Sequence, residues 1–216
     1  MNILLMGAAG SGKGTMAARI VLDFDIPHIS TGNMFRAAIT AQTELGKIAQ
    51  TYMDQGRLVP DELTIELVKE RLSACDCQKG YLLDGFPRTL TQAEAFEDIA
   101  AQIGRPVEAV FNLTVHLEDL KQRVVGRRIC ENCGAIFNTI GSAPKVEGIC
   151  DRCGFSLVHR SDDTVEQLGN RLHEHMVLTQ PVLDFYRNKA LVHNIDASRK
   201  PELVYGDIFS ILRLLR

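Results

Sequence analysis

The sequence lacks any apolar run that approaches the ~18 residues of a membrane span, so we expect no membrane partner. It also lacks a charged N-terminal segment with a cleavage site, so we expect no secretory signal, a cytoplasmic location and reduced thiols. Its 24 basic residues are outnumbered by 27 acidic ones, and the net charge of −3 argues against a protein devoted to nucleic acid. Any bound anion must therefore be held by a local cluster of cations.

Internal repeats and low-complexity segments are also absent from the 216 residues, and 45% hydrophobic content is ordinary for a folded core. Strand-like runs alternate with helical patterns of roughly 10–20 residues, which predicts an α/β fold with a parallel sheet between helices. We expect strands at residues 2–6, 27–29, 81–84, 107–115 and 191–196. We expect helices at residues 13–22, 33–53 with a break near Gly46, 61–74, 91–103, 117–125, 163–189 with a disturbance at Pro181, and 201–215.

Four glycines lie within eight residues directly after the first predicted strand, in the stretch "GAAGSGKGT" (residues 7–15). The spacing Gly-x4-Gly-Lys between a strand and a helix is typical of a phosphate-binding loop. Glycines at positive φ let successive N–H groups face one anion, and the helix N-terminus adds partial positive charge. Lys13 would reach the terminal phosphates. Because Gly14 stands where the motif usually has Ser or Thr, Thr15 is the candidate hydroxyl. The alternative is a glycine-rich turn with a surface lysine.

Several arginines stand at predicted strand ends and at the edges of the segment 126–163, although any single arginine is usually a solvated surface group. An ATP and a nucleoside monophosphate would bring about five to six negative charges into one cleft. Transfer between them needs charge stabilisation and in-line positioning, and no base, because the accepting phosphate is already an anion. Asp84 would order the water shell of Mg²⁺, or simply cap the turn before Gly85. The arginines are Arg36, Arg88, Arg123, Arg127, Arg128, Arg160 and Arg171.

Two Cys-x-x-Cys pairs, Cys130 with Cys133 and Cys150 with Cys153, are separated by 16 residues. This spacing is typical of a four-thiolate zinc site, which would be structural because all four ligands come from the protein. A disulfide framework and iron are the alternatives. The metal would replace a core that residues 126–163 are too polar to build. We expect Cys75 and Cys77 to fill space, and His173 and His175 to lie on the surface.

The stretches "GAAGSGKGT", "HISTGNMFR", "GRLVPDE", "GYLLDGFPRTLTQAE", "VVGRR" and "RSDD", with the cysteine pairs, resemble the adenylate kinase family of P-loop nucleoside monophosphate kinases, in its long bacterial form with a zinc-bearing lid. The resemblance covers essentially the whole chain. It implies a three-layer P-loop NTPase-type parallel sheet flanked by helices (residues 1–29, 60–125 and 164–216). It also implies an inserted helical AMP-binding lobe (residues 30–59), a small zinc-binding β lid (residues 126–163) and a monomer that converts ATP and AMP into two ADP with Mg²⁺.

The resemblance also assigns roles to individual residues of this sequence. The expected catalytic residues are Lys13, Arg88, Arg127, Arg160 and Arg171. The expected ATP-binding residues are Gly10, Ser11, Gly12, Lys13, Gly14, Thr15, Arg123, Arg127, Ile136, Phe137 and Lys200. The expected AMP-binding residues are Thr31, Arg36, Arg57, Leu58, Val59, Gly85, Phe86, Pro87, Arg88, Gln92, Arg160 and Arg171, with Gln92 reading the adenine edge. Asp84 would hold magnesium through water, the cysteines would hold zinc, and Asp162 with Asp163 would latch the closed lid.

Three departures from the family pattern bear on these expectations. Ala9 replaces a usual proline in the loop, Asn33 replaces a usual aspartate, and the segment "DASRKP" is one residue longer, so that Arg199 competes with Lys200. Two other functions remain open. One is a kinase for UMP, CMP or GMP, and the other is a zinc-ribbon nucleic-acid-binding protein with an ATPase switch, which would need a basic, aromatic-rich lid.

Overall fold

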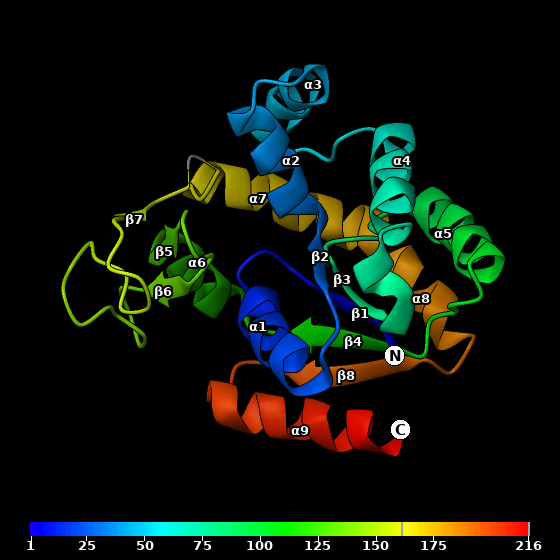
Figure 1. Ribbon diagram of the computed structural model, residues 1–216. Helices are drawn as coiled ribbons and strands as arrows, with labels where there is room; N and C mark the ends of the chain where they lie inside the picture. The colour runs from blue at the N-terminus through cyan, green and yellow to red at the C-terminus, as the bar shows by residue number, and fades with distance from the viewer. Residues whose placement is uncertain (161, 216) are drawn as a thin grey trace.

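A five-stranded parallel sheet forms the centre of the computed structural model, which describes residues 1–160 and 162–215 (Figure 1). The strands lie in the order β2-β3-β1-β4-β8, with the first strand in the middle. The predicted parallel α/β sheet is therefore confirmed. Ser161 of the "RSDD" motif and Arg216 lie outside the described residues. The strands of this sheet are β1 (Asn2–Gly7), β2 (His28–Ser30), β3 (Tyr81–Asp84), β4 (Ala109–Thr114) and β8 (Val192–Asp196).

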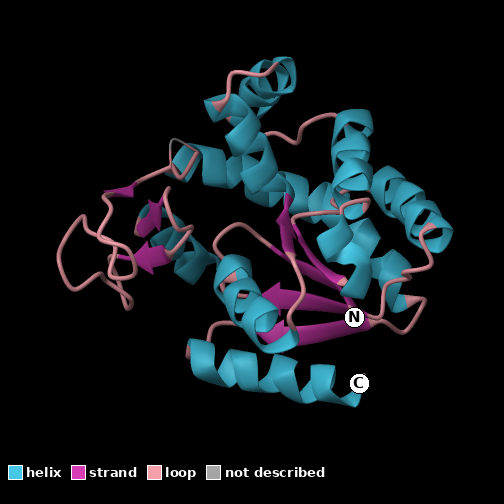
Figure 2. Ribbon diagram, viewed as in Figure 1, coloured by secondary structure: helices cyan, strands magenta, loops and turns pink. Residues whose placement is uncertain are grey.

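Helices cover both faces of this sheet because alternate side chains of each central strand point to opposite sides (Figure 2). In β1, Leu4 and Met6 join one buried cluster, whereas Ile3 and Leu5 join the other. The first cluster is closed by α4 (Asp61–Leu72), α5 (Leu90–Gln102) and α8 (Gln180–Arg187). The second is closed by α1 (Lys13–Phe24) and α9 (Pro201–Leu214).

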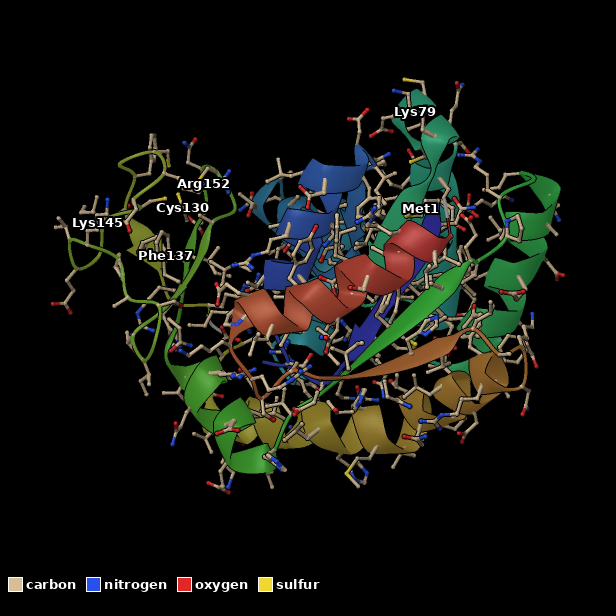
Figure 3. The ribbon with its side chains drawn as sticks, turned by 90° about the horizontal axis from the view of Figure 1, so that it is seen from below. Met1, Lys79, Cys130, Phe137, Lys145 and Arg152 are labelled. Carbon is tan, nitrogen blue, oxygen red and sulfur yellow. The ribbon has the colours of Figure 1, made fainter. Side chains whose placement is uncertain are left out.

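Two smaller groups of elements have cores of their own. Helices α2 (Thr31–Thr40) and α3 (Glu44–Met53) pack around Phe35, Ala49 and Val59. A three-stranded antiparallel sheet follows α6 (Leu117–Val125), and Cys130, Ala135 and Cys150 are its buried centre. Figure 3 shows this second group, with Cys130, Phe137, Lys145 and Arg152, at the left of the view, well apart from Met1 and Lys79. Its strands are β5 (Arg127–Cys130), β6 (Ile136–Asn138) and β7 (Leu157–Val158).

The expected break in this helical stretch is present but lies at residues 41–43, because α2 ends at Thr40 and α3 begins at Glu44, so Gly46 is inside α3. Thr43 starts α3 by accepting a hydrogen bond from the Gly46 backbone N–H at 3.0 Å. Gly46 instead lets the two helices pack closely, since a Cβ there would lie 2.1 Å from the Ala38 carbonyl oxygen. A glycine that serves helix packing cannot be told from a helix breaker in the sequence alone.

The expected disturbance near Pro181 is confirmed. Helix α7 (Val165–Glu174) passes into a π-helical turn, η2 (His175–Thr179), directly before α8. A short 3₁₀ turn, η1 (Cys75–Lys79), buries Cys77 but leaves Cys75 exposed, so only one of these cysteines fills space as expected. Within the part of the chain that the structure describes, no helix has the length and apolarity needed to cross a membrane.

Candidate active site

One cavity of about 1330 Å³ opens at the carboxyl ends of the central strands. The register places Leu5 of β1 and Ser30 of β2 beside Asp84 of β3, so the segments that follow these strands meet at one edge. Ligands of open α/β sheets bind at this edge. Most of the predicted site residues line the cavity: Gly10, Ser11, Gly12, Lys13, Gly14, Thr15, Thr31, Arg36, Arg57, Leu58, Val59, Asp84, Gly85, Arg88, Gln92, Arg123, Arg127, Ile136, Phe137, Arg160, Asp162 and Arg171.

The phosphate loop (residues 7–15) curls around the Lys13 side chain. Its Nζ donates hydrogen bonds to the carbonyl oxygens of Gly7 at 2.8 Å and Ala8 at 3.0 Å. Burial lowers the pKa of Lys13 to about 8, against the opposing charge of Asp84. The Lys13 ammonium group is therefore poorly solvated, which favours its pairing with a phosphate.

At Gly10 and Gly14 of this loop, an added side chain would come close to a neighbouring residue. Gly10 has φ +85°, and a Cβ there would lie 2.8 Å from Val124 Cγ2. Gly14 is helical, but a Cβ there would lie 2.7 Å from Ile136 Cδ1 of the lid. A Ser or Thr directly after Lys13 would therefore require the end of the Ile136 side chain, which lies over the first turn of α1, to shift.

Two acidic residues, Asp162 and Asp163, contact three of the predicted arginines. Asp163 is 1% exposed and accepts hydrogen bonds from both Arg127, at 2.7 Å from Nε, and Arg171, at 3.5 Å from Nη1. Asp162 accepts from Arg171 at 3.2 Å and lies 3.8 Å from Arg36. Burial alone would raise the pKa of Asp162, but these arginines lower it below its usual value. The two carboxylates pair with guanidinium groups that would otherwise be free to bind phosphates.

Arg36, Arg88 and Arg160 lie close to other arginines, and the nearby carboxylates are too few to neutralise all of them. Burial, and then the neighbouring charge of Arg171, lowers the pKa of Arg88 to about 10. Burial, and then the charge of Arg36, lowers the pKa of Arg160 to about 9. Arg36 and Arg160 share the Asn33 side-chain oxygen, at 2.8 Å and 3.5 Å. Cations whose pKa values are lowered by burial and by neighbouring positive charge favour the binding of a polyanion.

Asp84 lies at the end of β3, is 9% exposed and lines the cavity. Burial alone would raise its pKa, but the hydrogen bond with His28 and the charge of Lys13 lower it. His28 Nε2 lies 3.3 Å from Asp84 Oδ2. The carboxylate is therefore ionised and oriented, and an oxygen ligand of this kind fits the water shell of Mg²⁺. His28 is a partner that sequence reasoning missed, although it stands within the quoted "HISTGNMFR".

The other arm of the cavity lies between α2, α5 and the loop before α4. Thr31 Oγ1 donates to the Gly85 carbonyl oxygen at 2.9 Å, and Arg88 Nε donates to the same oxygen at 2.8 Å. The Leu58 backbone N–H donates to Glu174 Oε2 of α7 at 2.9 Å. Glu174 is a second residue that sequence reasoning missed, because the contact joins positions 116 residues apart.

The first turns of helix α7 also form hydrogen bonds with the backbone at the end of the α2–α3 lobe. Gln167 Nε2 donates to the Asp54 carbonyl oxygen at 2.7 Å, and Asn170 Nδ2 donates to that of Gln55 at 3.1 Å. The same helix carries Arg171 toward the cavity. One helix therefore contacts both the lid exit and the lobe.

Some predicted residues lie away from the main cavity. Phe86 and Pro87 line a smaller cavity of about 60 Å³ instead, together with His175. Ala197, Arg199 and Pro201 line the main cavity where Lys200 does not. His173 is exposed, as expected. The expectation for His175 is wrong, because it is half-buried and burial lowers its pKa to about 4, so it is neutral at pH 7.

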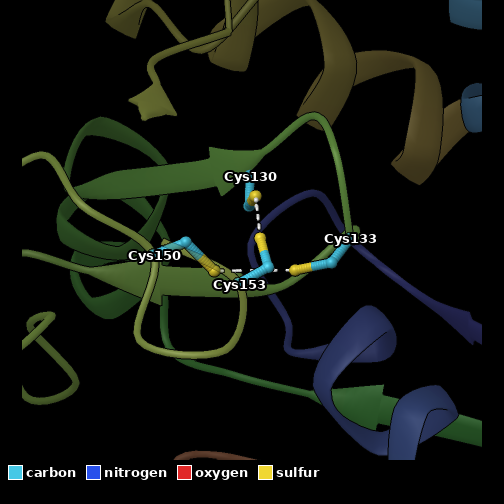
Figure 4. Close-up of side chains that lie close together, drawn as sticks. All are labelled: Cys130, Cys133, Cys150 and Cys153. Atoms are coloured by element: carbon cyan, nitrogen blue, oxygen red, sulfur yellow. Dashed lines mark hydrogen bonds between the residues drawn. The ribbon is translucent and has the colours of Figure 1, made fainter. Parts of the chain in front are cut away.

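The four cysteines of the lid converge as their spacing predicts, with all sulfur atoms within 4.8 Å of one another (Figure 4). Sγ of Cys130 lies 3.4 Å from that of Cys153, and Sγ of Cys133 lies 3.5 Å from that of Cys150, so no disulfide joins them. Such sulfur separations fit a tetrahedral ion with metal–sulfur bonds of about 2.3 Å.

The two cysteine pairs have the same backbone geometry. In each, the first cysteine donates its N–H to the residue five positions on, from Cys130 to Ala135 at 2.9 Å and from Cys150 to Phe155 at 2.8 Å. In each, a glycine at positive φ (Gly134 and Gly154) closes the turn by donating to that cysteine's carbonyl oxygen at 2.9 Å. Two equivalent turns thus present four thiols to one point.

A phosphate loop that faces arginines from a separate lid has room and charge for two phosphorylated ligands, and this fold and site define a P-loop nucleoside monophosphate kinase. The family model described as adenylate kinase matches residues 5–191. The chain belongs to the adenylate kinase family. It is 52% identical over 212 residues to an adenylate kinase of Staphylococcus aureus strain Mu50, and 50% identical over 212 residues to one of Staphylococcus epidermidis strain ATCC 12228. Both alignments cover 98% of this chain and 99% of the relative.

Proposed function

We propose that this chain catalyses the reversible transfer of the terminal phosphoryl group of ATP to AMP, which gives two ADP. One observation carries the proposal. The phosphate loop, with Lys13, and the arginines of the lid, β3 and α7 line the same cavity, whose 1330 Å³ can take two nucleotides. The reaction needs many cations, and those that line the cavity include Lys13, Arg36, Arg88, Arg123, Arg127, Arg160 and Arg171.

On the ATP side, the backbone N–H groups of residues 10–15 would bind the phosphates, and Lys13 would exchange its two loop carbonyls for phosphate oxygens. Arg123 and Arg127 would approach from the lid. Ile136 and Phe137 would contact the base, together with the backbone near Lys200. The cavity wall at Arg199 and Pro201 supports an adenine position beside this segment.

On the AMP side, Arg36 and Arg88 would bind the single phosphate. Arg160 and Arg171 would bridge the two nucleotides and stabilise the charge on the transferred group. Gln92 would read the adenine edge. The remaining contacts would come from Thr31, Arg57, Leu58, Val59, Gly85, Phe86 and Pro87.

The chemistry would follow from positioning and charge. The arginines hold the acceptor phosphate oxygen in line with the terminal phosphoryl group, and Lys13, Arg88, Arg127, Arg160 and Arg171 neutralise the charge that spreads over its oxygens. Mg²⁺ would enter with ATP and supply further charge neutralisation. Asp84, ionised and oriented by His28, would hold its water shell.

The lid would be a metal-stabilised unit (residues 126–163) that closes over ATP and excludes water, with Asp162 and Asp163 as its latch. Its buried centre is small, with Cys130, Ala135 and Cys150, and this supports a structural zinc held by Cys130, Cys133, Cys150 and Cys153. The AMP-binding lobe would comprise residues 30–59, and the core residues 1–29, 60–125 and 164–216.

The proposal includes a monomer in the cytoplasm that acts on small nucleotides, and binds neither nucleic acid nor membrane. Both nucleotides would bind in a cavity built by one chain, which supports a monomer. Free thiols at all six cysteines fit a reducing compartment.

The test is the formation of ADP from ATP and AMP with Mg²⁺, followed by a coupled assay in both directions, with zinc counted in the same preparation. UMP, CMP and GMP at equal concentration are the competing acceptors. Rapid turnover with AMP as the acceptor, and with none of the other three monophosphates, supports the proposal. A fully metallated protein that phosphorylates another monophosphate in preference to AMP would overturn it.

A further inference from the structure

The side-chain amide of Gln92 is held at both ends. Gln92 is 2% exposed and lines the cavity from the first turn of α5. Its Nε2 donates to Asp61 Oδ1 at 2.7 Å, and its Oε1 accepts from the Arg88 backbone N–H at 2.8 Å. Both partners come from outside the helix that carries Gln92.

These partners dictate which end of the amide is oxygen. An ionised carboxylate only accepts hydrogen bonds, and a backbone N–H only donates them. If the amide rotated by half a turn, its oxygen would face the Asp61 carboxylate and its NH₂ would face the Arg88 N–H, and both hydrogen bonds would be lost. Asp61 and the Arg88 backbone therefore fix one orientation.

Asp61 is itself fixed. It is the first residue of α4, where a negative charge is favoured by the helix dipole. Its second oxygen accepts from Thr89 Oγ1 at 2.8 Å, and Thr89 caps α5 by accepting from the Gln92 backbone N–H at 3.1 Å. The starts of two helices are thus joined through one carboxylate.

We infer that Asp61 is a specificity-determining positioning residue, which sets the order of donor and acceptor that Gln92 presents to the purine of the monophosphate. The inference rests on the proposed function, in which Gln92 faces the base. After its two internal bonds, the amide keeps one N–H and one oxygen lone pair. Adenine offers an N6 amino donor beside the N1 acceptor, whereas hypoxanthine and guanine offer the O6 acceptor beside an N1–H donor. A fixed amide matches only one order.

The test compares AMP with IMP, two acceptors that share a purine shape and differ in this order. In Asp61→Asn the neutral amide can donate or accept, so it no longer dictates the orientation of Gln92. We expect the ratio of kcat/KM for AMP to that for IMP to fall about tenfold, mainly through a higher KM for AMP, with kcat within about twofold. Asp61→Ser, which keeps a good helix-start residue but is too short to reach Gln92, is expected to behave alike.

Glu62→Gln is the matched control. Glu62 is exposed in the same first turn, and its replacement removes the same charge from the helix start. It is expected to keep the wild-type ratio, and melting temperatures of all variants check folding. An unchanged AMP-to-IMP ratio in either folded Asp61 variant would overturn the inference, as would an equal change in Glu62→Gln. A failure of the proposed function is distinct, since the wild type would then not phosphorylate AMP. Gln92→Ala reports separately whether Gln92 reads the base.

Discussion

Arg127, at the start of the lid, forms two hydrogen bonds through its guanidinium group with the carboxylate of Asp163, at the exit of the lid. Asp163 is 1% exposed, and Arg171 of α7 contacts the same carboxylate. The two ends of the lid segment are therefore joined by one buried ion pair, directly beside the cavity. This pair joins the start of the segment 126–163 to α7, and Arg127 lines the cavity.

Replacement of Asp163 by Asn should reduce the free energy of unfolding by about 3 kcal/mol, because it leaves two guanidinium groups beside a buried neutral side chain. Urea denaturation measures this change. Asp162→Asn is the comparison, since Asp162 lies farther from its partners, and we expect a loss of about 1 kcal/mol there. Equal stability of Asp163→Asn and the wild type would show that this pair does not stabilise the fold.

The lowered pKa of Lys13 predicts a pH dependence for ATP binding. In the free protein its pKa is about 8, so the ammonium form needed by the phosphates is present below that pH and is lost above it. We expect kcat/KM for ATP to fall about tenfold per pH unit above pH 8, at saturating AMP. Lys13→Arg keeps its charge between pH 8 and 9, so its profile should be flat over that range at a lower level, and any fall above pH 9 would belong to Arg160, whose pKa burial lowers to about 9. A flat wild-type profile up to about pH 10 would contradict this assignment.

Loss of the proposed zinc should reduce stability more than it reduces turnover. Cys130→Ser is expected to lose bound zinc and to melt at least about 5 °C lower, because the lid has little other core. Turnover at 25 °C should change less, since the phosphate-binding residues lie outside the cysteine cluster. Cys75→Ser, at an exposed cysteine outside the cluster, should leave melting and zinc content unchanged. Unchanged melting with abolished turnover in Cys130→Ser would argue for a catalytic metal.

Two glycines of the phosphate loop separate backbone strain from packing. Gly12 has φ +98° with nothing within 4 Å of an added Cβ, whereas at Gly10 that Cβ would meet Val124 Cγ2 at 2.8 Å. Gly12→Ala should lower the free energy of unfolding by about 1 kcal/mol through conformation alone, and Gly10→Ala by about 2–3 kcal/mol. Denaturation without nucleotide measures both. A Gly10→Ala variant as stable as Gly12→Ala would show that Val124 moves aside freely.

The sequence predicts features whose cause is local. The phosphate loop needs glycines next to one lysine, and the cysteine turns need two thiols three positions apart, so both stand as short patterns in the chain. The buried strands were also predictable, because a parallel sheet covered on both faces requires continuous apolar runs. In each of these cases the residues that meet the physical requirement are neighbours in the chain, so the requirement can be seen in the sequence.

Contacts across the fold leave no such pattern. His28 meets Asp84 from another strand, and Asp61 meets Gln92 from another helix, and neither residue type is unusual at its position. The position of Lys200 depends on a turn whose length differs by one residue from the family pattern, so the sequence could not decide between it and Arg199. Gly46 looks like a helix breaker, and only the neighbouring helix α2 reveals that it is a packing residue.

The contacts of α7 decide where this chain can be cut and rejoined. The helix begins two residues after Asp163, and Gln167 and Asn170 grip the backbone of Asp54 and Gln55. A chimera that receives a foreign lid only up to residue 163 would keep the original α7, and the foreign segment would not match the start of that helix. Junctions placed after Glu174 would transplant the segment 126–163 together with the helix that contacts both its exit and the α2–α3 lobe.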